Sequence, residues 1–84
     1  MSEARRQTRI VYEGFMELAN GNGGVVEVGD LVTYLRGRNR PMGAWEVRGE
    51  LSTLQAAGLV AVDEESASWR PVEGQDFDSA YAAA

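Results

Sequence analysis

Apolar residues near the start of the chain repeat at the spacing of one helix face. Val11, Phe15 and Leu18 recur at intervals of four and three residues, which places them on the same side of an α-helix. Ser2 can cap such a helix, and the glycine-rich sequence NGNGG that follows supplies residues that end helices. The pattern therefore predicts a helix over about residues 2–20 that packs on the core through this face.

Two further apolar residues of this helix widen its apolar stripe. Tyr12 and Met16 are four residues apart on a neighbouring face, so the stripe is wide for a helix on a small core. They fit ordinary positions at the edge of the core, and they also fit an interface with a second copy of the chain, together with Phe77 and Tyr81. We predict a homodimer with Tyr12 and Met16 at its interface, because a chain of 84 residues buries only a modest core alone.

Shorter patterns follow in the middle of the chain. Residues 25–28, with the sequence VVEV, form a short strand candidate. Residues 30–36 then carry Leu31 and Leu35 at helical spacing, which predicts a second helix. The sequence GRNRPM at residues 37–42 breaks that helix, because the residue before a proline is restricted to extended conformations.

The third helical pattern is the clearest in the sequence. Val47, Leu51 and Leu54 recur at intervals of four and three residues, so they should point into the core. Gly58 stands where a glycine commonly ends a helix. We therefore predict a helix over about residues 43–57.

A hairpin pattern follows this helix. The sequence LVAV at residues 59–62 fits a strand, DEES at residues 63–66 a turn, and ASWRPV at residues 67–72 the returning strand. The proline near the end of the second strand requires an edge position or the strand terminus, since it has no amide hydrogen to donate. The remaining residues are acidic or small, with a short helical stretch around Phe77 as an alternative to a flexible tail.

The order of helix, strand, helix, turn, helix and β-hairpin resembles the winged helix-turn-helix transcription regulators. Two segments carry the resemblance, GDLVTYLRG in the second helix and the pattern VxxxLxxLxxxGLV that starts at Val47. The resemblance covers about residues 5–72. It implies an α+β fold of three helices with a small antiparallel sheet and a hairpin called the wing, in a domain over residues 1–72. We expect residues 73–84 to form a flexible acidic tail.

The distribution of charge changes this picture in one respect. The chain carries a net charge of -5, with 13 carboxylates against eight basic residues. Residues 1–48 hold seven of the arginines, whereas residues 49–84 hold only one together with seven carboxylates. A negative total weakens non-specific binding to DNA, but the local field at the contact surface matters more. The absence of lysine fits either a GC-rich coding bias or the suitability of arginine for phosphates and guanine edges.

Composition argues against several function classes. The chain has no histidine and no cysteine, which removes the commonest general base, the thiolate nucleophile and the commonest metal ligands. The sequence GNGG lacks the lysine of a phosphate-binding loop and follows a helix instead of a strand. We therefore expect neither an enzyme nor a bound cofactor or metal. We find no signal-peptide pattern and no membrane span, and we expect a soluble, cytoplasmic protein.

The resemblance places the third helix in the major groove of double-stranded DNA, where the family reads bases mostly with the first half of that helix. The residues opposite the predicted core positions are then the candidate contacts, namely Ala44, Trp45, Arg48, Gly49 and Ser52. Arg48 can donate two hydrogen bonds to a guanine edge. Gly49 fits a close approach of a DNA backbone, and it also fits packing against the second helix or a glycine fixed by drift without a role. Trp45 fits either the core or a surface contact.

Arginines near the second turn and on the wing complete the candidate DNA site. Arg36, Arg38 and Arg40 flank or occupy the turn between the second and third helices, where they could clamp phosphates, and Arg70 lies on the wing. We expect a small sequence-specific DNA-binding regulator. The alternative is a protein-interaction module or a DNA-mimicking antagonist that uses the acidic wing and the two tryptophans.

Overall fold

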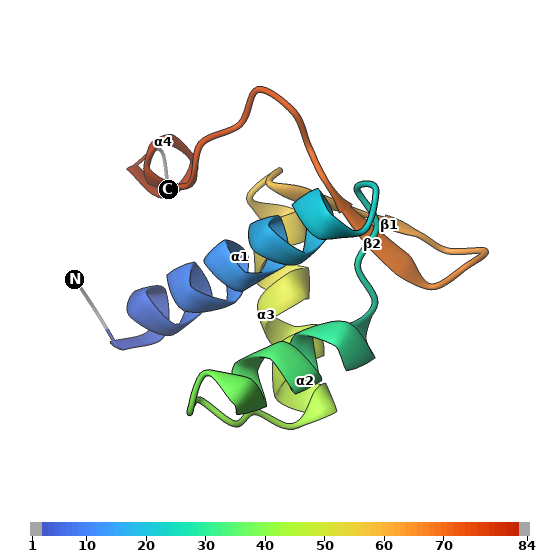
Figure 1. The fold of residues 1–84 in the computed structure, drawn as a ribbon. Coiled ribbons are helices and arrows are strands. Elements are labelled where there is room, and N and C mark those ends of the chain that lie inside the picture. The colour runs from blue at the N-terminus through green and yellow to red at the C-terminus, as the bar shows by residue number, and fades with distance from the viewer. Residues whose placement is uncertain (1–2, 83–84) are drawn as a thin grey trace.

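The computed structural model describes residues 3–82, and the side chains of residues 5–80. These residues form a small α+β fold in which three longer helices pack together, a two-stranded hairpin follows them, and a short helix lies beside the first (Figure 1). The elements are α1 (Glu3–Gly21), α2 (Val28–Gly37), α3 (Ala44–Ala56), β1 (Val60–Asp63), β2 (Ser68–Pro71) and α4 (Phe77–Ala82). Ser2, our predicted cap, and the side chain of Tyr81 lie outside the described part.

Helix α1 packs on the core through a stripe that differs slightly from the predicted one. Val11 and Phe15 are fully buried, as predicted. Leu18 is only half-buried, and Ala19 takes its place in the core with 3% of its surface exposed. The buried residue that follows Phe15 on this face is therefore Ala19, four residues later, whereas the predicted one was Leu18, three residues later.

The predicted strand at residues 25–28 is reduced to a single paired residue. Val26 exchanges two backbone hydrogen bonds with Trp69, of 2.8 and 2.7 Å, and forms an isolated bridge beside β2. The chain turns into α2 directly afterwards, because the Asp30 carboxylate accepts a hydrogen bond of 3.1 Å from the amide of Glu27. Helix α2 therefore begins at Val28, two residues earlier than predicted.

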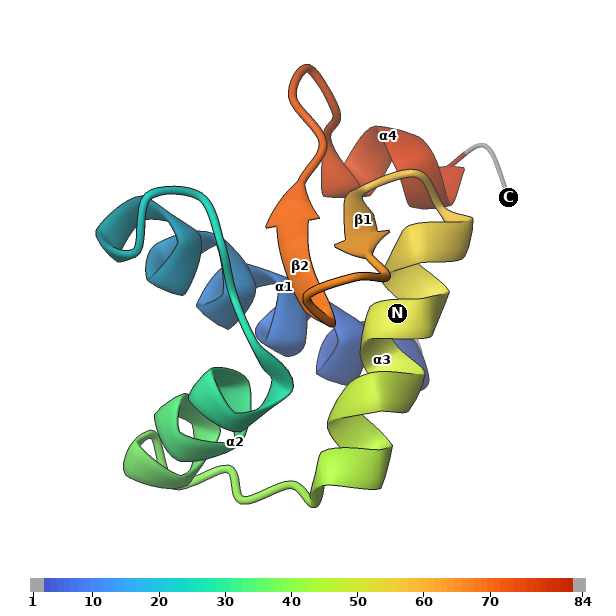
Figure 2. The same ribbon diagram turned by 90° about the vertical axis from the view of Figure 1, so that its right-hand side faces the viewer.

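Helix α3 agrees with its prediction in position and orientation. Val47, Leu51 and Leu54 are fully buried at the centre of the core. Figure 2 shows the beginning of α3 beside α2, and its end beside the hairpin. Its opposite side therefore points away from the packed interior.

The end of α3 is set by its glycine. Gly58 has a φ of +80°, a left-handed conformation that a residue with a side chain rarely adopts. Its amide donates to the carbonyl of Gln55, and the amide of Leu59 donates to the carbonyl of Leu54, both at 3.0 Å. This pair of bonds is the Schellman arrangement that closes many helices. It directs Leu59 into the core and the chain into β1.

The hairpin is present, with shorter strands than predicted. Strands β1 and β2 pair antiparallel, with Val62 opposite Trp69, and the connecting turn covers residues 64–67. Ala67 belongs to this turn because its φ of 57° is incompatible with a strand. Trp69 pairs with Val26 on its other side, so β2 lies between β1 and the Val26 bridge.

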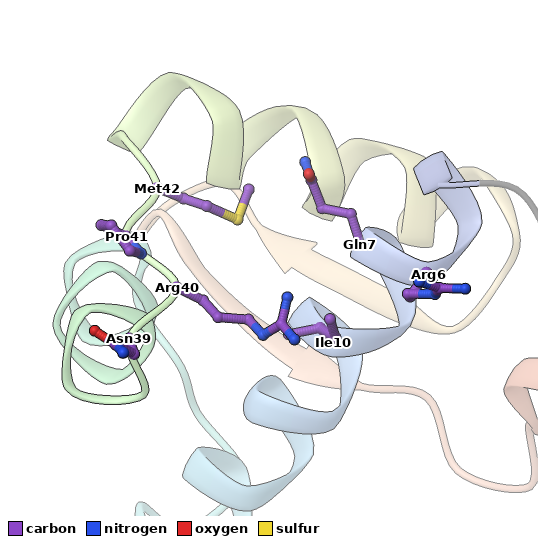
Figure 3. A pocket seen from close by; sticks show the side chains of 7 residues that line it. All are labelled: Arg6, Gln7, Ile10, Asn39, Arg40, Pro41 and Met42. Atoms are coloured by element: carbon purple, nitrogen blue, oxygen red, sulfur yellow. The ribbon is translucent and has the colours of Figure 1, made fainter.

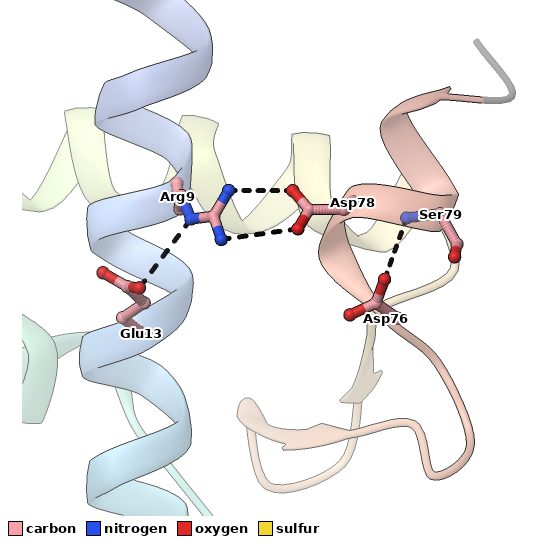
Figure 4. Close-up of polar contacts among 5 residues, drawn as sticks. All are labelled: Arg9, Glu13, Asp76, Asp78 and Ser79. Carbon is pink, nitrogen blue, oxygen red and sulfur yellow. Dashed lines mark hydrogen bonds and ion pairs between the residues drawn. The ribbon is translucent and has the colours of Figure 1, made fainter.

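Helix α4 occupies part of the segment that the sequence analysis treats as a flexible tail. Phe77 is 4% exposed and belongs to the core cluster, and its ring stacks on Tyr12 of α1 with centroids 5.8 Å apart. Arg9 forms an ion pair of 2.8 Å with Asp78 (Figure 4). The Arg9 guanidinium also lies 5.4 Å from the centre of the Phe77 ring. The structure thus attaches this segment to α1. Across residues 3–82, no helix combines the length and the apolar composition that crossing a membrane requires.

Candidate functional site

The side of α3 that points away from the core carries an unusual set of exposed residues. We call this surface the α3 outer face and define it by Trp45, Arg48, Gly49 and Ser52, all of which are exposed. Trp45 has 84% of its surface in solvent. From the sequence, Trp45 fitted either a core or a surface position, and the structure places it on the surface. Ala44, in the first turn of the same helix, is exposed as well.

Gly49 lies in the middle of this face with empty space around it. A Cβ atom added at Gly49 would meet no other atom within 4 Å. Packing against α2 therefore does not explain this glycine, and its backbone is ordinary helix. A glycine at an exposed helix position costs about 1 kcal/mol relative to alanine. The α3 outer face thus lacks a side chain at its centre, and the packing of the chain does not require this glycine.

Clefts open on both sides of Arg48. One, of about 430 Å³, lies between the first turns of α2 and α3 and is lined by Val28, Gly29, Ala44, Trp45 and Arg48. The other, of about 340 Å³, lies between α3 and the hairpin and is lined by Val28, Arg48, Ser52, Val62, Glu64, Ala67 and Trp69. Arg48 therefore lines both clefts. Trp45 lines the cleft beside α2, and Trp69 lines the cleft beside the hairpin.

Arg48 is the one arginine of α3, and its charge is not neutralised by the carboxylates of the same helix. Glu50 faces α1, where it accepts hydrogen bonds of 2.6 Å from Thr8 and 2.9 Å from Gln7. Glu46 turns back to the first turn and accepts a hydrogen bond of 3.4 Å from the backbone amide of residue 43. No ion pair joins Arg48 to a carboxylate among the described residues. Arg48 is therefore the basic side chain of the α3 outer face, and a carboxylate of the hairpin, that of Glu64, lines the cleft beside it.

The three arginines expected to clamp phosphates do not share one environment. Arg38 forms an ion pair of 3.2 Å with Glu17 of α1, and its guanidinium lies 4.8 Å from the ring centre of Tyr34. Arg40 lies beside α1, in a cavity described below. Arg36 is exposed in the last turn of α2. Arg38 and Arg40 are thus directed toward α1, whereas the α3 outer face points away from the core.

Arg70 and the acidic turn form the remaining part of the predicted site. Successive residues of a strand point to opposite faces. Since Trp69 lines the cleft beside α3, the exposed Arg70 next to it points to the other side of the hairpin. The turn keeps its carboxylates at the surface, and the amide of Glu65 donates a hydrogen bond of 3.0 Å to Asp63. The structure therefore does not place Arg70 beside Arg48.

The predicted subunit interface on α1 is partly covered from within the chain. Tyr12 and Met16 are half-buried and pack against the core cluster. Tyr12 is also stacked on Phe77 of α4, and its burial, together with the negative charge of Asp76, raises the pKa of its hydroxyl above 10.0. Helix α4 therefore accounts for part of the wide apolar stripe that suggested a second subunit.

Sequence reasoning missed a hollow that Arg6 and Arg40 line together. It lies between α1 and the loop that joins α2 to α3 (Figure 3). Arg6 and Arg40 both line it, although they are far apart in the sequence. No local pattern could have predicted this meeting, because it depends on the path of the loop across α1.

Within the described residues, no three acidic side chains come close enough together to hold a metal ion. Compared with known proteins, the chain matches no protein family, no curated protein and no solved structure.

Proposed function

We propose that this protein is a winged helix-turn-helix protein that binds double-stranded DNA with the α3 outer face and acts as a sequence-specific transcriptional regulator. The observation that carries the proposal is the α3 outer face itself. Arg48 is exposed and forms no ion pair with any described residue, and it stands beside Gly49, where an added Cβ atom would meet nothing within 4 Å. The order of three helices and a hairpin is compatible with that family of folds.

Each residue of the α3 outer face has a role in this proposal. Arg48 donates two hydrogen bonds to the O6 and N7 atoms of a guanine in the major groove. Gly49 lets the helix backbone come close to the DNA, since no side chain intervenes. Trp45 supplies an apolar contact to a thymine methyl group or a sugar, and Ser52 donates to a base edge or a phosphate.

Other arginines supply contacts that do not depend on sequence. Arg36 and Arg70 are exposed and have no ion pair among the described residues, so both are available to phosphates. Arg38 and Arg40 remain candidate phosphate contacts at the α1 side of the domain. Arg38 can keep its bond to Glu17 while it contacts a phosphate, because a guanidinium has five N–H donors.

The homodimer stays part of the proposal, with Met16 and the exposed part of Tyr12 at its interface. Sedimentation at micromolar concentration should then give twice the 9.1 kDa of one chain. Replacing Tyr12 and Met16 by serine should give a monomer, because it removes apolar area from the interface. A wild-type chain that sediments as a monomer would contradict this part of the proposal without affecting the assignment of the α3 outer face.

A protein partner is the second candidate, and the exposure of Trp45 favours it. Tryptophan is enriched among the residues that dominate binding energy in protein interfaces. The hairpin carries three consecutive carboxylates at residues 63–65, and one of them, Glu64, lines the cleft beside Arg48. In this case the α3 outer face would dock on a protein whose surface is basic around an apolar pocket.

Selection from a pool of random duplex DNA separates the two candidates. The DNA proposal predicts enrichment of a short common sequence that binds far more tightly than the starting pool. If no duplex binds better than about 10⁻⁴ M, the weak end of ordinary non-specific binding, the DNA proposal fails. An affinity for DNA that increases when the arginines are replaced would favour a protein partner.

A further inference from the structure

A surface cavity between α1 and the loop before α3 has the composition of a ligand site. We call it the α1–loop cavity. Its volume is about 310 Å³, and it is lined by Arg6, Gln7, Ile10, Asn39, Arg40, Pro41 and Met42. Figure 3 shows the Arg40 side chain extending from the loop toward Ile10 on α1. It lies at the α1 side of the domain and shares no residue with the α3 outer face.

The charge of the cavity is opposite to that of the whole chain. Two guanidinium groups line it, those of Arg6 and Arg40, and its lining includes no carboxylate. Arg6 makes a further contact within the chain, so Arg40 is the residue on which the inference depends. No ion pair joins Arg40 to a carboxylate among the described residues. Within a chain of net charge -5, the charged side chains that line this cavity are therefore both basic, and the carboxylate of Glu13 shares the adjoining hollow with Arg40.

An apolar surface lies next to the two arginines. Ile10 and Met42 are half-buried and pack against the core cluster while they line the cavity. Methionine adapts its shape to what it contacts, because its side chain is unbranched and flexible. The amide of Gln7 donates a hydrogen bond of 2.9 Å to Glu50, which fixes the orientation of that wall.

Size and chemistry together define the class of ligand. Small-molecule sites usually occupy about 300–1,000 Å³, so a cavity near the lower limit suits a compact molecule. Arginine recognises carboxylate and phosphate groups with two parallel hydrogen bonds. We propose that the α1–loop cavity binds a small organic anion, with its carboxylate or phosphate group on Arg40 and a short apolar body on Ile10 and Met42.

Such a ligand would contact two parts of the domain at once, α1 and the loop before α3. The loop leaves α2 through Asn39, which has a φ of 64°, and the amide of Arg40 donates a hydrogen bond of 2.9 Å to Leu35. After Pro41 the loop runs directly into α3. A ligand that touches both α1 and this loop would hold the first turn of α3 in place. The binding itself does not depend on whether α3 contacts DNA.

Nuclear magnetic resonance titrations of the full 84-residue chain test the proposal without DNA. The probes are hexanoate, hexyl phosphate and 1-hexanol, which share one apolar body and differ in the head group. Both anions should shift the backbone amide signals of residues 6–10, 39, 40 and 42 to saturation, and the tighter of the two identifies the preferred head group. Hexanol should bind at least about tenfold more weakly, because it makes no charge-assisted hydrogen bond.

Substitutions of Arg40, compared with a control substitution of Arg36, test whether the anion binds at Arg40. R40Q should weaken binding of both anions about tenfold or more, and R40K should lose less because it keeps the charge without the planar fork. R36Q is the control, since Arg36 is exposed but does not line the cavity. The same spectra report whether each variant is folded.

Three outcomes would overturn the proposal. The first is the absence of saturable shifts at residues 6–10, 39, 40 and 42 with either anion. The second is an equal loss of affinity in R36Q and R40Q, which would indicate general attraction to a basic surface. The third is a set of shifts at these residues caused by duplex DNA but by neither anion, which would assign Arg40 to a DNA phosphate.

Discussion

Gly14 and Gly49 both lie inside helices, yet only Gly14 is required by the packing of the chain. A Cβ atom added at Gly14 would lie 2.7 Å from Cε1 and 2.9 Å from Cδ1 of Tyr34. That ring is held in place, because the Tyr34 hydroxyl donates a hydrogen bond to Glu17, and the bond raises the pKa of the hydroxyl above 10.0. The absence of a side chain at Gly14 thus lets α2 approach α1.

Alanine substitutions at the two glycines should have opposite effects on the free energy of unfolding. G14A should lower it by about 1–3 kcal/mol, the cost of overpacking an interior position. G49A should raise it by up to about 1 kcal/mol, because alanine favours the helix and meets only solvent. Urea unfolding of both variants measures the difference. A destabilised G49A would show that this glycine has a structural role, and it would weaken the argument for the α3 outer face as a binding surface.

The elements differ in how far the sequence could predict them. The leucines of α3 and its terminal glycine are a strong local pattern, and the structure confirms the buried positions of Leu51 and Leu54. The sequence VVEV favours a strand locally, but the Asp30 carboxylate starts α2 at residue 28 and leaves only Val26 to pair. Helix α4 could be predicted only as an alternative to a flexible tail, because Phe77 lies in an acidic segment that has no repeating apolar pattern typical of a helix.

The positions of the candidate site residues were only partly predictable. The exposure of Arg48 and Ser52 follows from the helical period of α3, because they lie opposite its buried residues. The partners of Arg38 could not be deduced, since its contact with Glu17 depends on how α1 and α2 pack. Periodicity fixes the face of a helix that a residue occupies, whereas the path of a loop across a neighbouring helix has no local signal.

Helix α4 should contribute to stability through Phe77 and not through its ion pair. F77A should lower the free energy of unfolding by about 1.5–3 kcal/mol, the value of burying a phenylalanine side chain. D78N removes the ion pair with Arg9, in which the Asp78 side chain is 59% exposed, so its effect should stay below about 1 kcal/mol. Thermal and urea unfolding measure both. An F77A variant as stable as the wild type would show that α4 is not part of the core in solution.

For the molecule as a whole, the question is how an acidic chain could bind a polyanion. The carboxylates of α3 are engaged with α1 and with the first turn of the helix, whereas Arg48 is not. The three carboxylates at residues 63–65, at the end of β1 and in the hairpin turn, remain exposed and would repel phosphates. Glu64 lines the same cleft as Arg48, so these carboxylates would lower the affinity for any DNA held at the proposed contact.

Neutralising the hairpin turn should strengthen non-specific binding. The triple variant D63N/E64Q/E65Q removes three negative charges, so the affinity for a scrambled duplex should increase at low salt. The increase should diminish as the salt concentration rises, because salt screens charges at the surface. The ratio of affinities for the selected and the scrambled duplex should not increase, since base contacts are unchanged. Unchanged affinity for both duplexes would indicate that the hairpin turn lies far from bound DNA.

The central claim is that the α3 outer face binds DNA, and fluorescence anisotropy with the selected and a scrambled duplex tests it most directly. R48A should lower the affinity for the selected duplex by about 1–3 kcal/mol and that for the scrambled duplex by less, so the ratio of the two affinities should fall. R70A is the matched control: it removes the same charge from the far side of the hairpin, so any loss should be equal for both duplexes. Equal losses in R48A for the two duplexes, or no loss at all, would contradict the claim.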